Sequence, residues 1–323
     1  MFVPPPRTSP YGPDVVCLGE TMAVLSPPDA SSLGRQTYLS LGVGGAESNV
    51  ACGLAVLGHR AAWVGRVGAD PLGRRVLDEL AGRGVDVSAV ETDPERSTGV
   101  YFKDPAADGT RTYYYRRDSA ATLMGPGLAR LPLLAAARLL HVSGITAALS
   151  DSCAELLTAL VVRRAVPGPL VSFDVNHRPA LWRHRPAGTA PAALLELARA
   201  ADIVFVGRDE AEALWDTGKP GEIRDLLRPA RVIVVKDAGH GATSYGADGT
   251  EVFVPTPASR VVERVGAGDA FAAGYLAALL EDRDAAAGLT LGHRMAAVTL
   301  GTREDVPTAV DRVELRRLFP PDV

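Results

Sequence analysis

Short apolar runs that each end at a polar residue or a glycine recur along the chain, and this feature constrains the fold most strongly. The runs are DVVCLG, AAWVGRVG, ARLLHVSG, PLVSFDVN, ADIVFVG and ARVIVVKD. Segments with helical spacing separate them, at 46–57, 71–82, 151–166 and 191–200. Strands that alternate with helices predict an α/β fold with a doubly wound, mainly parallel sheet covered by helices on both faces. In such sheets ligands bind beyond the carboxyl ends of the strands.

One segment breaks this alternation. TGVYFKDPAADGTRTYYYRRDSA, at 98–120, holds two β-rich runs around PAADG and predicts a hairpin. Because one hairpin is not stable alone, we expect it to join extended residues near 23–41 in a small sheet beside the main domain. A second hairpin is expected around TSYGADGTEVFVPT.

Length and composition allow one large α/β domain or two ordinary ones. The chain has 323 residues, of which 47% are hydrophobic and 22% charged. No linker is long enough to separate two domains, so we expect a single domain at 14–323 after a disordered tail at 1–13. That tail lacks the apolar core of a secretory signal.

Charge and cysteine content exclude several classes of partner. The net charge is −4 and no Lys/Arg block occurs, so we expect no nucleic-acid partner. No long apolar run occurs, so we expect no membrane partner. Cys17, Cys52 and Cys153 lie far apart, which predicts reduced thiols and a cytoplasmic location rather than disulfides or a zinc site.

The segment ERVGAGDAFAAGYLAALL predicts a packed helix that begins near Ala267. The first N–H groups of a helix have no intrahelical partner, and Gly266 and Gly268 leave room for an anion to approach them. Asp269 is then either an acid that favours a helix start or a general base beside an anion hole. Neither a P-loop nor a G-x-G-x-x-G fingerprint occurs.

Two segments resemble the signatures of the ribokinase-like (PfkB) carbohydrate kinases. VERVGAGDAFAAGYLAALL is similar to the C-terminal signature, and LGVGGAESNVACGLAVLG is similar to the N-terminal one. The resemblance extends from Asp14 to about Leu318. It implies ATP-dependent phosphorylation of a sugar-like hydroxyl, a Mg²⁺ requirement, and a small β-sheet lid built from residues near 23–41 and 98–120.

The resemblance also implies roles for residues in the two signatures. Asp269 matches the catalytic base, and the anion hole matches Gly266, Ala267 and Gly268. The substrate end of the first signature matches Gly44, Gly45 and Asn49, where glycines admit sugar hydroxyls and an amide can both donate and accept. Without the resemblance, a strand-to-helix turn and a helix cap would explain these three residues equally well.

The nucleotide side matches less closely. KDAGHGA resembles the nucleotide loop through Lys236, Gly239 and Gly241, but Ala238 replaces the first glycine of the pattern. An ordinary β-turn is the alternative.

VGRDEAEAL resembles the segment whose glutamate, here Glu210, organises Mg²⁺ and phosphate through water. Gly207 replaces a polar residue there, and a solvated helix start is the alternative. His293 falls near the expected adenine site or is a surface histidine. Glu263-Arg264-Val265 departs from the family where a monovalent cation binds, which leaves potassium activation open.

The segments YYRRDSAA, GGAESN and DVNHRPALW resemble the 2-keto-3-deoxygluconate kinase branch. That resemblance implies that the substrate is bound by Tyr101, Tyr114, Arg116 and Arg178. Two guanidinium groups suit a substrate carboxylate. Strand alternation puts Tyr114 and Arg116 on one face and Tyr113 and Tyr115 on the other, without saying which faces inward.

Other interpretations stay open at this point. The arginines can be solvated lid charges, and the protein can be a fructokinase, a 5-keto-2-deoxygluconate kinase or another PfkB sugar kinase. A non-catalytic sugar or nucleotide sensor is the alternative from another class. The implied partners are ATP and a sugar or sugar acid, and the exposed lid edge predicts a homo-oligomer that associates through the lid.

Overall fold

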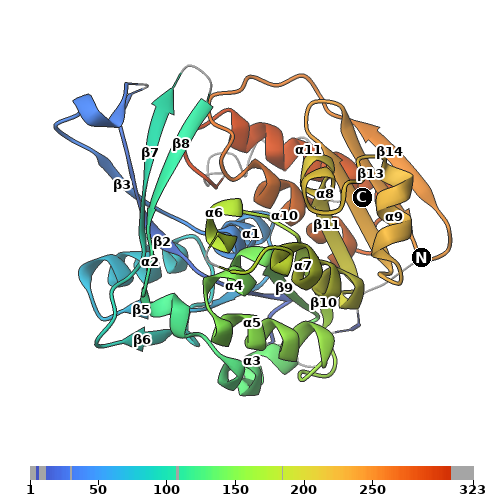
Figure 1. Ribbon diagram of the computed structural model, residues 1–323, viewed down its shortest axis with the longest axis horizontal. Coiled ribbons are helices and arrows are strands. Elements are labelled where there is room, and N and C mark those ends of the chain that lie inside the picture. Colours follow the sequence, from blue (N-terminus) through green and yellow to red (C-terminus); the bar gives the residue numbers. More distant parts are fainter. Residues whose placement is uncertain (1–4, 7–11, 30, 107–108, 184, 307–323) are drawn as a thin grey trace.

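An eight-stranded sheet forms the centre of the fold, in the order β14-β13-β12-β11-β10-β9-β1-β4 (Figure 1). Neighbouring strands from β4 to β12 are parallel, and β12, β13 and β14 are antiparallel. The strands are β1 Val15–Leu18, β4 Ala61–Val64, β9 Leu139–Ser143, β10 Leu170–Asp174, β11 Ile203–Gly207, β12 Val232–Asp237, β13 Gly241–Gly246 and β14 Glu251–Pro255. The predicted doubly wound, mainly parallel sheet is confirmed, and the second predicted hairpin is β13–β14.

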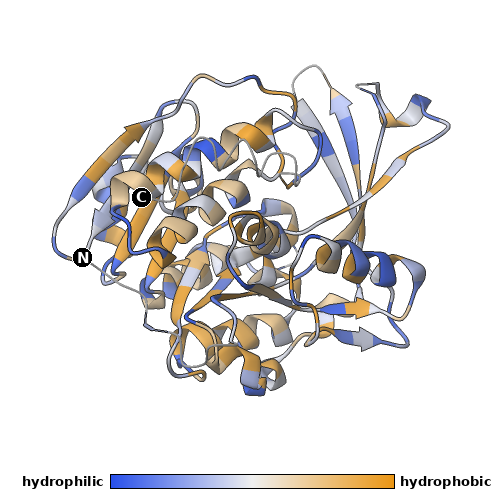
Figure 2. Cartoon of the chain, turned by 180° about the vertical axis from the view of Figure 1, so that it is seen from behind, coloured by the Kyte–Doolittle hydropathy of each residue, from blue (hydrophilic) through white to orange (hydrophobic). Residues whose placement is uncertain are grey.

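Helices cover both faces of this sheet, so its parallel strands are buried on both sides. Every residue of β1, β9 and β11 is buried, which is why these strands read as continuous apolar runs. Within β1, Val15 and Cys17 belong to one hydrophobic core, and Val16 and Leu18 belong to the other. In Figure 2 the hydrophobic colour is concentrated on the central strands and the helices packed against them.

Each core contains its own layer of helices. One layer comprises α1 Ala46–Val56, α2 Pro71–Gly82, α10 Ala267–Leu280 and α11 Ala285–Leu300. The other comprises α3 Pro132–Ala135, α4 Gly144–Leu149, α5 Asp151–Leu157, α6 Pro179–Trp182, α7 Thr189–Ala200, α8 Arg208–Trp215 and α9 Pro220–Leu227. Helix α10 is buried from Ala270 to Leu280, as its apolar sequence predicted.

Two predicted elements differ from the structure in detail. The single helix predicted at 151–166 is α5 followed by a π-helical turn, Thr158–Val162, and Arg164 then adopts a φ of 51° that ends the helix. The run AAWVGRVG makes two strands, because the chain leaves the main sheet after β4. Its second half, β5 Arg66–Gly68, pairs in parallel with β6 Glu91–Asp93. Short 3-10 helices occur at Leu33–Arg35, Ala120–Leu123 and Pro126–Arg130.

A smaller four-stranded sheet stands beside the main domain, as the odd hairpin predicted (Figure 1). Its order is β3-β2-β7-β8, with β2 Met22–Ser26, β3 Ser40–Gly44, β7 Val100–Ala106 and β8 Gly109–Tyr115. Strands β7 and β8 form the predicted hairpin. Strand β2, from the N-terminal part of the chain, pairs in parallel with β7.

This computed structural model describes residues 5–6, 12–29, 31–106, 109–183 and 185–306. Most of the predicted tail at 1–13 and the C-terminal part of the predicted domain, 307–323, lie outside these residues. Gly12 and Pro13 are buried, and Pro5 O accepts a hydrogen bond of 2.9 Å from Arg138 Nε. In the described part of the chain, no helix combines the length and apolarity that a membrane crossing requires.

Candidate active site

The two glycine-containing segments singled out in the sequence meet at the carboxyl ends of the parallel strands. Asp269 lies in the first turn of α10, and Asn49 lies in the first turn of α1. Although 220 positions separate them, Asn49 Nδ2 donates a hydrogen bond of 2.8 Å to Asp269 Oδ2. The structure therefore brings the predicted base and the predicted substrate segment into direct contact.

The start of α10 offers room for an anion. Gly266 precedes the helix with a φ of 83°, a conformation that glycine adopts without strain, and a Cβ there would collide with Asp305 O. Gly268 is exposed, and outside the helix only Lys236 Nζ, at 3.7 Å, lies near the position of a Cβ on it. A positive ammonium group thus stands beside the N-terminus of α10, where the helix dipole also favours negative charge.

The surroundings of Asp269 alter its acidity. The side chain is half-buried, and the pKa of Asp269 is raised to about 7, chiefly by burial, although the hydrogen bond from Asn49 acts to lower it. The negative charge of Asp174 raises this pKa further, and the positive charges of Arg178 and Lys236 lower it. A carboxyl group that titrates near neutral pH can accept a proton at the pH of the cell.

Asp174, at the end of β10, pairs with Lys236, at the end of β12. Lys236 Nζ donates to Asp174 Oδ2 at 2.8 Å, and only 3% of Asp174 is exposed. Burial alone would lower the pKa of Lys236, but the charges of Asp174 and Glu210 raise it, so the ammonium stays charged. Asp174 was not predicted from the sequence, although a carboxylate at the end of a buried strand is a signal that points to this edge of the sheet.

Glu210 joins two backbone segments at the same edge. One carboxylate oxygen accepts a hydrogen bond of 2.8 Å from Gly207 N at the start of α8, and the other accepts one of 2.9 Å from His177 N. Arg178 is half-exposed, and its guanidinium lies 3.9 Å from Glu210. Gly207 therefore contacts Glu210 through its backbone N–H, and a contact with the nucleotide stays a prediction.

The residues present fit a hydrated Mg²⁺ bound together with phosphates. In the described part of the chain, no three His, Cys, Asp or Glu side chains gather closely enough to hold a metal ion by themselves. Mg²⁺ in nucleotide sites usually keeps several waters and takes one or two carboxylates besides the phosphates. Asp174 and Glu210 both lie close enough to Lys236 to affect its charge, and they are the carboxylates available for that role.

Gly44 and Gly45 join β3 to α1, and neither has room for a side chain. A Cβ on Gly44 would meet Tyr101 Oη and would lie 2.8 Å from Asp305 Oδ2, and a Cβ on Gly45 would meet Glu20 O. Tyr101 donates a hydrogen bond to Asp305, which is also paired with the buried Lys103. Asp305 was not found from the sequence, because it reaches Tyr101 from the other end of the chain.

The structure settles which face of β8 looks inward. The rings of Tyr101 and Tyr114 are 5.4 Å apart on the side of the main domain, whereas Phe102 and Tyr115 pack edge to face on the outer side. Arg116 continues the inner face: it lies over the Tyr114 ring, 5.4 Å from its centroid, and pairs with Glu20. Tyr101, Tyr114 and Arg116 thus share the inner face, and their role in substrate binding stays a prediction.

The predicted nucleotide loop follows β12. Ala238 has a φ of 35°, so it adopts the left-handed region in which the glycine of the pattern would be unstrained, and Thr256 Oγ1 donates to Ala238 O at 2.7 Å. Gly239 is exposed, and Gly241 leaves room for the Phe253 ring, which packs against His240 at 5.3 Å. The loop thus keeps a left-handed turn without the glycine.

His293, on α11, is buried rather than at the surface. Its Nε2 lies 3.0 Å from Val254 O, and its ring packs edge to face on Phe271 at 5.2 Å. Burial lowers the pKa of His293, so the imidazole is neutral at neutral pH. The residue thus bridges β14 and α10, and an adenine contact stays a prediction.

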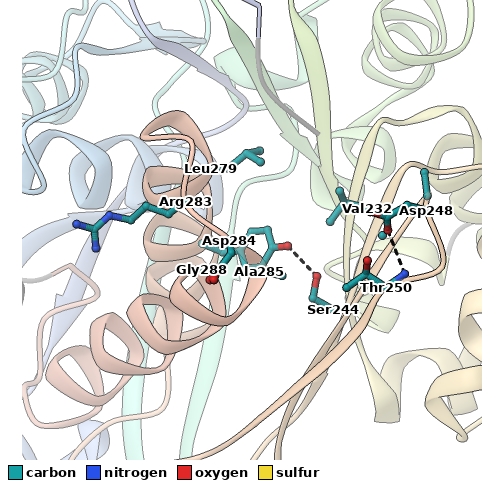
Figure 3. Close-up of a pocket in the computed structure, with 12 residues that line it drawn as sticks. Val232, Ser244, Asp248, Thr250, Leu279, Arg283, Asp284, Ala285 and Gly288 are labelled. Carbon is teal, nitrogen blue, oxygen red and sulfur yellow. Dashed lines mark hydrogen bonds between the residues drawn. The ribbon is translucent and has the colours of Figure 1, made fainter. Parts of the chain in front are cut away.

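A separate cavity of about 510 Å³ lies at the opposite end of α10 (Figure 3). Its lining includes Ser244, whose hydroxyl lies 2.8 Å from that of Tyr275, and Leu279 near the C-terminus of the helix. Neither Asp269 nor Lys236 contributes to it. The predicted site residues therefore do not belong to this cavity.

Comparisons with known proteins agree with the fold and show the family. Residues 13–309 match the pfkB family of carbohydrate kinases. The chain is 35% identical to the 2-dehydro-3-deoxygluconokinase of Bacillus subtilis, over 91% of this chain and 93% of the relative. It resembles the crystal structure of a PfkB protein from Polaromonas sp. JS666, with a TM-score of 0.84, 33% identity, and coverage of 94% of this chain and 99% of the other. An uncharacterized sugar kinase from Pyrococcus horikoshii, solved in complex with ATP, shares the fold with a TM-score of 0.81 and 23% identity, over 94% of this chain and 97% of the other.

Proposed function

The chain belongs to the pfkB family of carbohydrate kinases, and on that premise we propose that it transfers the γ-phosphoryl group of ATP to the terminal hydroxyl of 2-keto-3-deoxygluconate. This substrate is also called 2-dehydro-3-deoxygluconate, and the product is its 6-phosphate. The proposal rests on one observation above all: Asp269 lies at the N-terminus of α10, bonded to Asn49 and near the Lys236 ammonium.

In this mechanism Asp269 accepts the proton of the sugar hydroxyl while the oxygen of that hydroxyl attacks the γ-phosphorus. The bond between that phosphorus and the bridging oxygen breaks, and ADP leaves with the electron pair. The N–H groups at Gly266, Ala267 and Gly268 bind the oxygens of the transferring group. Lys236, oriented by Asp174, supplies a positive charge beside them.

Mg²⁺, when bound with ATP, neutralises phosphate charge. Asp174 and Glu210 would hold its water ligands, and Glu210 also fixes the loop that carries His177 and Arg178. On the nucleotide side, Gly207, Gly239, Gly241 and His293 line the path of ATP. No step of the mechanism uses potassium, so turnover in potassium-free buffer tests that part of the cofactor prediction.

Arg116 and Arg178 bind the carboxylate of the substrate, with Tyr101 and Tyr114 beside it. Gly44, Gly45 and Asn49 contact the hydroxyls. A neutral sugar such as fructose offers no carboxylate to two guanidinium groups, which favours the acid sugar over the fructokinase alternative. The pKa of Asp269, about 7, suits a general base and so favours an enzyme over a sensor that only binds sugar or nucleotide.

The outer face of the lid supports a homo-oligomer built from copies of this chain. Tyr113 and Tyr115 are 45% and 68% exposed, and Leu41 is 36% exposed. Strand β8 is also an edge of its sheet, and exposed edges favour pairing. Tyr115→Glu should shift the mass measured by light scattering toward the monomer, whereas an unchanged mass would mean that another surface is used. The cytoplasmic location remains an expectation from the separated cysteines.

The reaction is tested by incubating the protein with ATP, Mg²⁺ and a panel of sugars. We expect ADP formation with 2-keto-3-deoxygluconate, and a phosphate monoester on its terminal carbon in the ³¹P spectrum. Phosphorylation of another carbon, or turnover of neutral sugars only, would reject the proposed substrate. The sensor would be favoured if the protein binds ATP and sugar without any turnover.

A further inference from the structure

Glu20 forms a buried ion pair with one of the predicted substrate arginines. It lies between β1 and β2 and is only 2% exposed. One carboxylate oxygen pairs with Arg116 NH2, and the other accepts a hydrogen bond of 2.8 Å from Ser119 Oγ. The Glu20 carbonyl oxygen lies against Gly45, one of the predicted substrate residues, so Glu20 is next to the predicted substrate segment.

The guanidinium group of Arg116 contacts Glu20 and Tyr114, but one of its N–H donors has no partner in the described part of the chain. The residue is 9% exposed, its guanidinium pairs with Glu20, and it lies over the ring of Tyr114. Its Nε is buried and finds no hydrogen-bond partner among the described residues. A buried donor without an acceptor is unfavourable, and in a binding site it points to a ligand that supplies the acceptor.

We propose that Glu20 is a positioning residue that fixes Arg116 so that its free Nε edge meets the carboxylate of an acid sugar. This inference rests on the proposed function, because it takes the substrate to be an acid. An arginine that is already ordered loses less rotamer freedom when the substrate binds. The Glu20 carboxylate, the Tyr114 ring and the Ser119 hydroxyl supply that order before binding.

A second role for Glu20 makes the opposite prediction. If Glu20 only balanced the charge of Arg116, its carboxylate would repel an acid substrate, and its loss would strengthen binding. If it positions Arg116, its loss weakens binding, because the guanidinium is then free to adopt other rotamers. The sign of the change in KM therefore separates the two roles.

The test is the KM of Glu20→Gln for 2-keto-3-deoxygluconate at saturating ATP. We expect KM to rise by about two- to tenfold with kcat retained, because the transferring end of the site is unchanged. In an Arg116→Met background the same substitution should add nothing. Glu20→Asp, which restores the charge, should recover part of the affinity, and Ser119→Ala should raise KM in the same direction if Glu20→Gln fails to fold.

Asp202→Asn is the matched control. It removes a carboxylate from the Arg164–Asp202 ion pair of 2.6 Å at the amino end of β11, and Asp202 is 9% exposed. A loss of stability alone would raise KM as much in this variant as in Glu20→Gln. If the wild type prefers the acid sugar but KM is unchanged or lower in Glu20→Gln, the inference about Glu20 is wrong and the proposed function stands. A wild type that prefers neutral sugars overturns the proposed function instead.

Discussion

Replacing Asn49 with alanine should move the pH dependence of the reaction in a defined direction. Asn49 Nδ2 donates a hydrogen bond of 2.8 Å to Asp269 Oδ2 and so stabilises the ionised carboxylate; this bond lowers the pKa of Asp269, burial raises it, and the net pKa is about 7. A hydrogen bond to a charged group contributes about 1.5–3 kcal/mol, and one pKa unit corresponds to about 1.36 kcal/mol. Losing the bond should therefore raise the pKa of Asp269 by about one to two units. Where water replaces part of the lost hydrogen bond, the pKa should rise by about one unit.

The assay is kcat/KM for the sugar from about pH 5 to about pH 9, which reports the pKa values of the free enzyme. The base must be ionised, so activity falls as the pH drops below its pKa. In Asn49→Ala the midpoint of this acid limb should lie about one unit higher than in the wild type. The part of the loss that comes from the pKa should recover at alkaline pH, whereas loss of the contact with the sugar lowers kcat/KM equally at every pH.

Two comparisons separate this effect from others. If Asn49 only contacts the sugar, its removal lowers kcat/KM equally at every pH. Ser244→Ala, on β13, is the control, because it breaks the 2.8 Å contact with Tyr275 Oη on α10, the helix that carries Asp269, and should leave the midpoint in place. An acid limb that does not move in Asn49→Ala would refute the reasoning that Asp269 is the base and that Asn49 sets its pKa.

The remaining predictions concern the same edge of the sheet. Asp269→Asn should lower kcat by about 10²–10⁴ with Tm and ATP binding retained, and near wild-type kcat would remove Asp269 from the role of base. Gly268→Val should abolish phosphoryl transfer with only a modest fall in Tm, because the side chain enters the space beside Lys236 Nζ; full activity would contradict the anion hole. Ala238→Gly should raise the free energy of unfolding by up to about 1–2 kcal/mol, since the φ of 35° strains alanine, and a lower Tm would show that the turn is not strained.

The fold was predictable because its signals are local. Apolar runs that end at glycine or polar residues gave β1 and β9 to β12, and the start of α10 at Ala267 followed from the glycines before it. The exit of the chain from the main sheet after β4 was not predictable, because AAWVGRVG reads as one continuous run, whereas its second half, β5, pairs with β6 instead.

The site was predictable only in part, because its decisive contacts join distant segments. Alternation along β8 could not say whether Tyr114 or Tyr113 faces the domain; the 5.4 Å contact with Tyr101 decides it. The partners of the predicted residues were missed in the same way. Each partner comes from a distant part of the chain, and no spacing in the sequence connects it to the residue that it contacts. The pairs are Asp174 with Lys236, Asp305 with Tyr101, and Glu20 with Arg116.

The central claim is tested most directly by the ratio of kcat/KM for 2-keto-3-deoxygluconate to that for fructose, measured in the wild type and in Arg178→Ala. We expect the wild type to prefer the acid sugar. Loss of one charged hydrogen bond to the carboxylate should lower kcat/KM for the acid by about ten- to a hundredfold and affect fructose much less. A wild type that turns over fructose more efficiently than the acid sugar would contradict the account and would place the protein with the fructokinases.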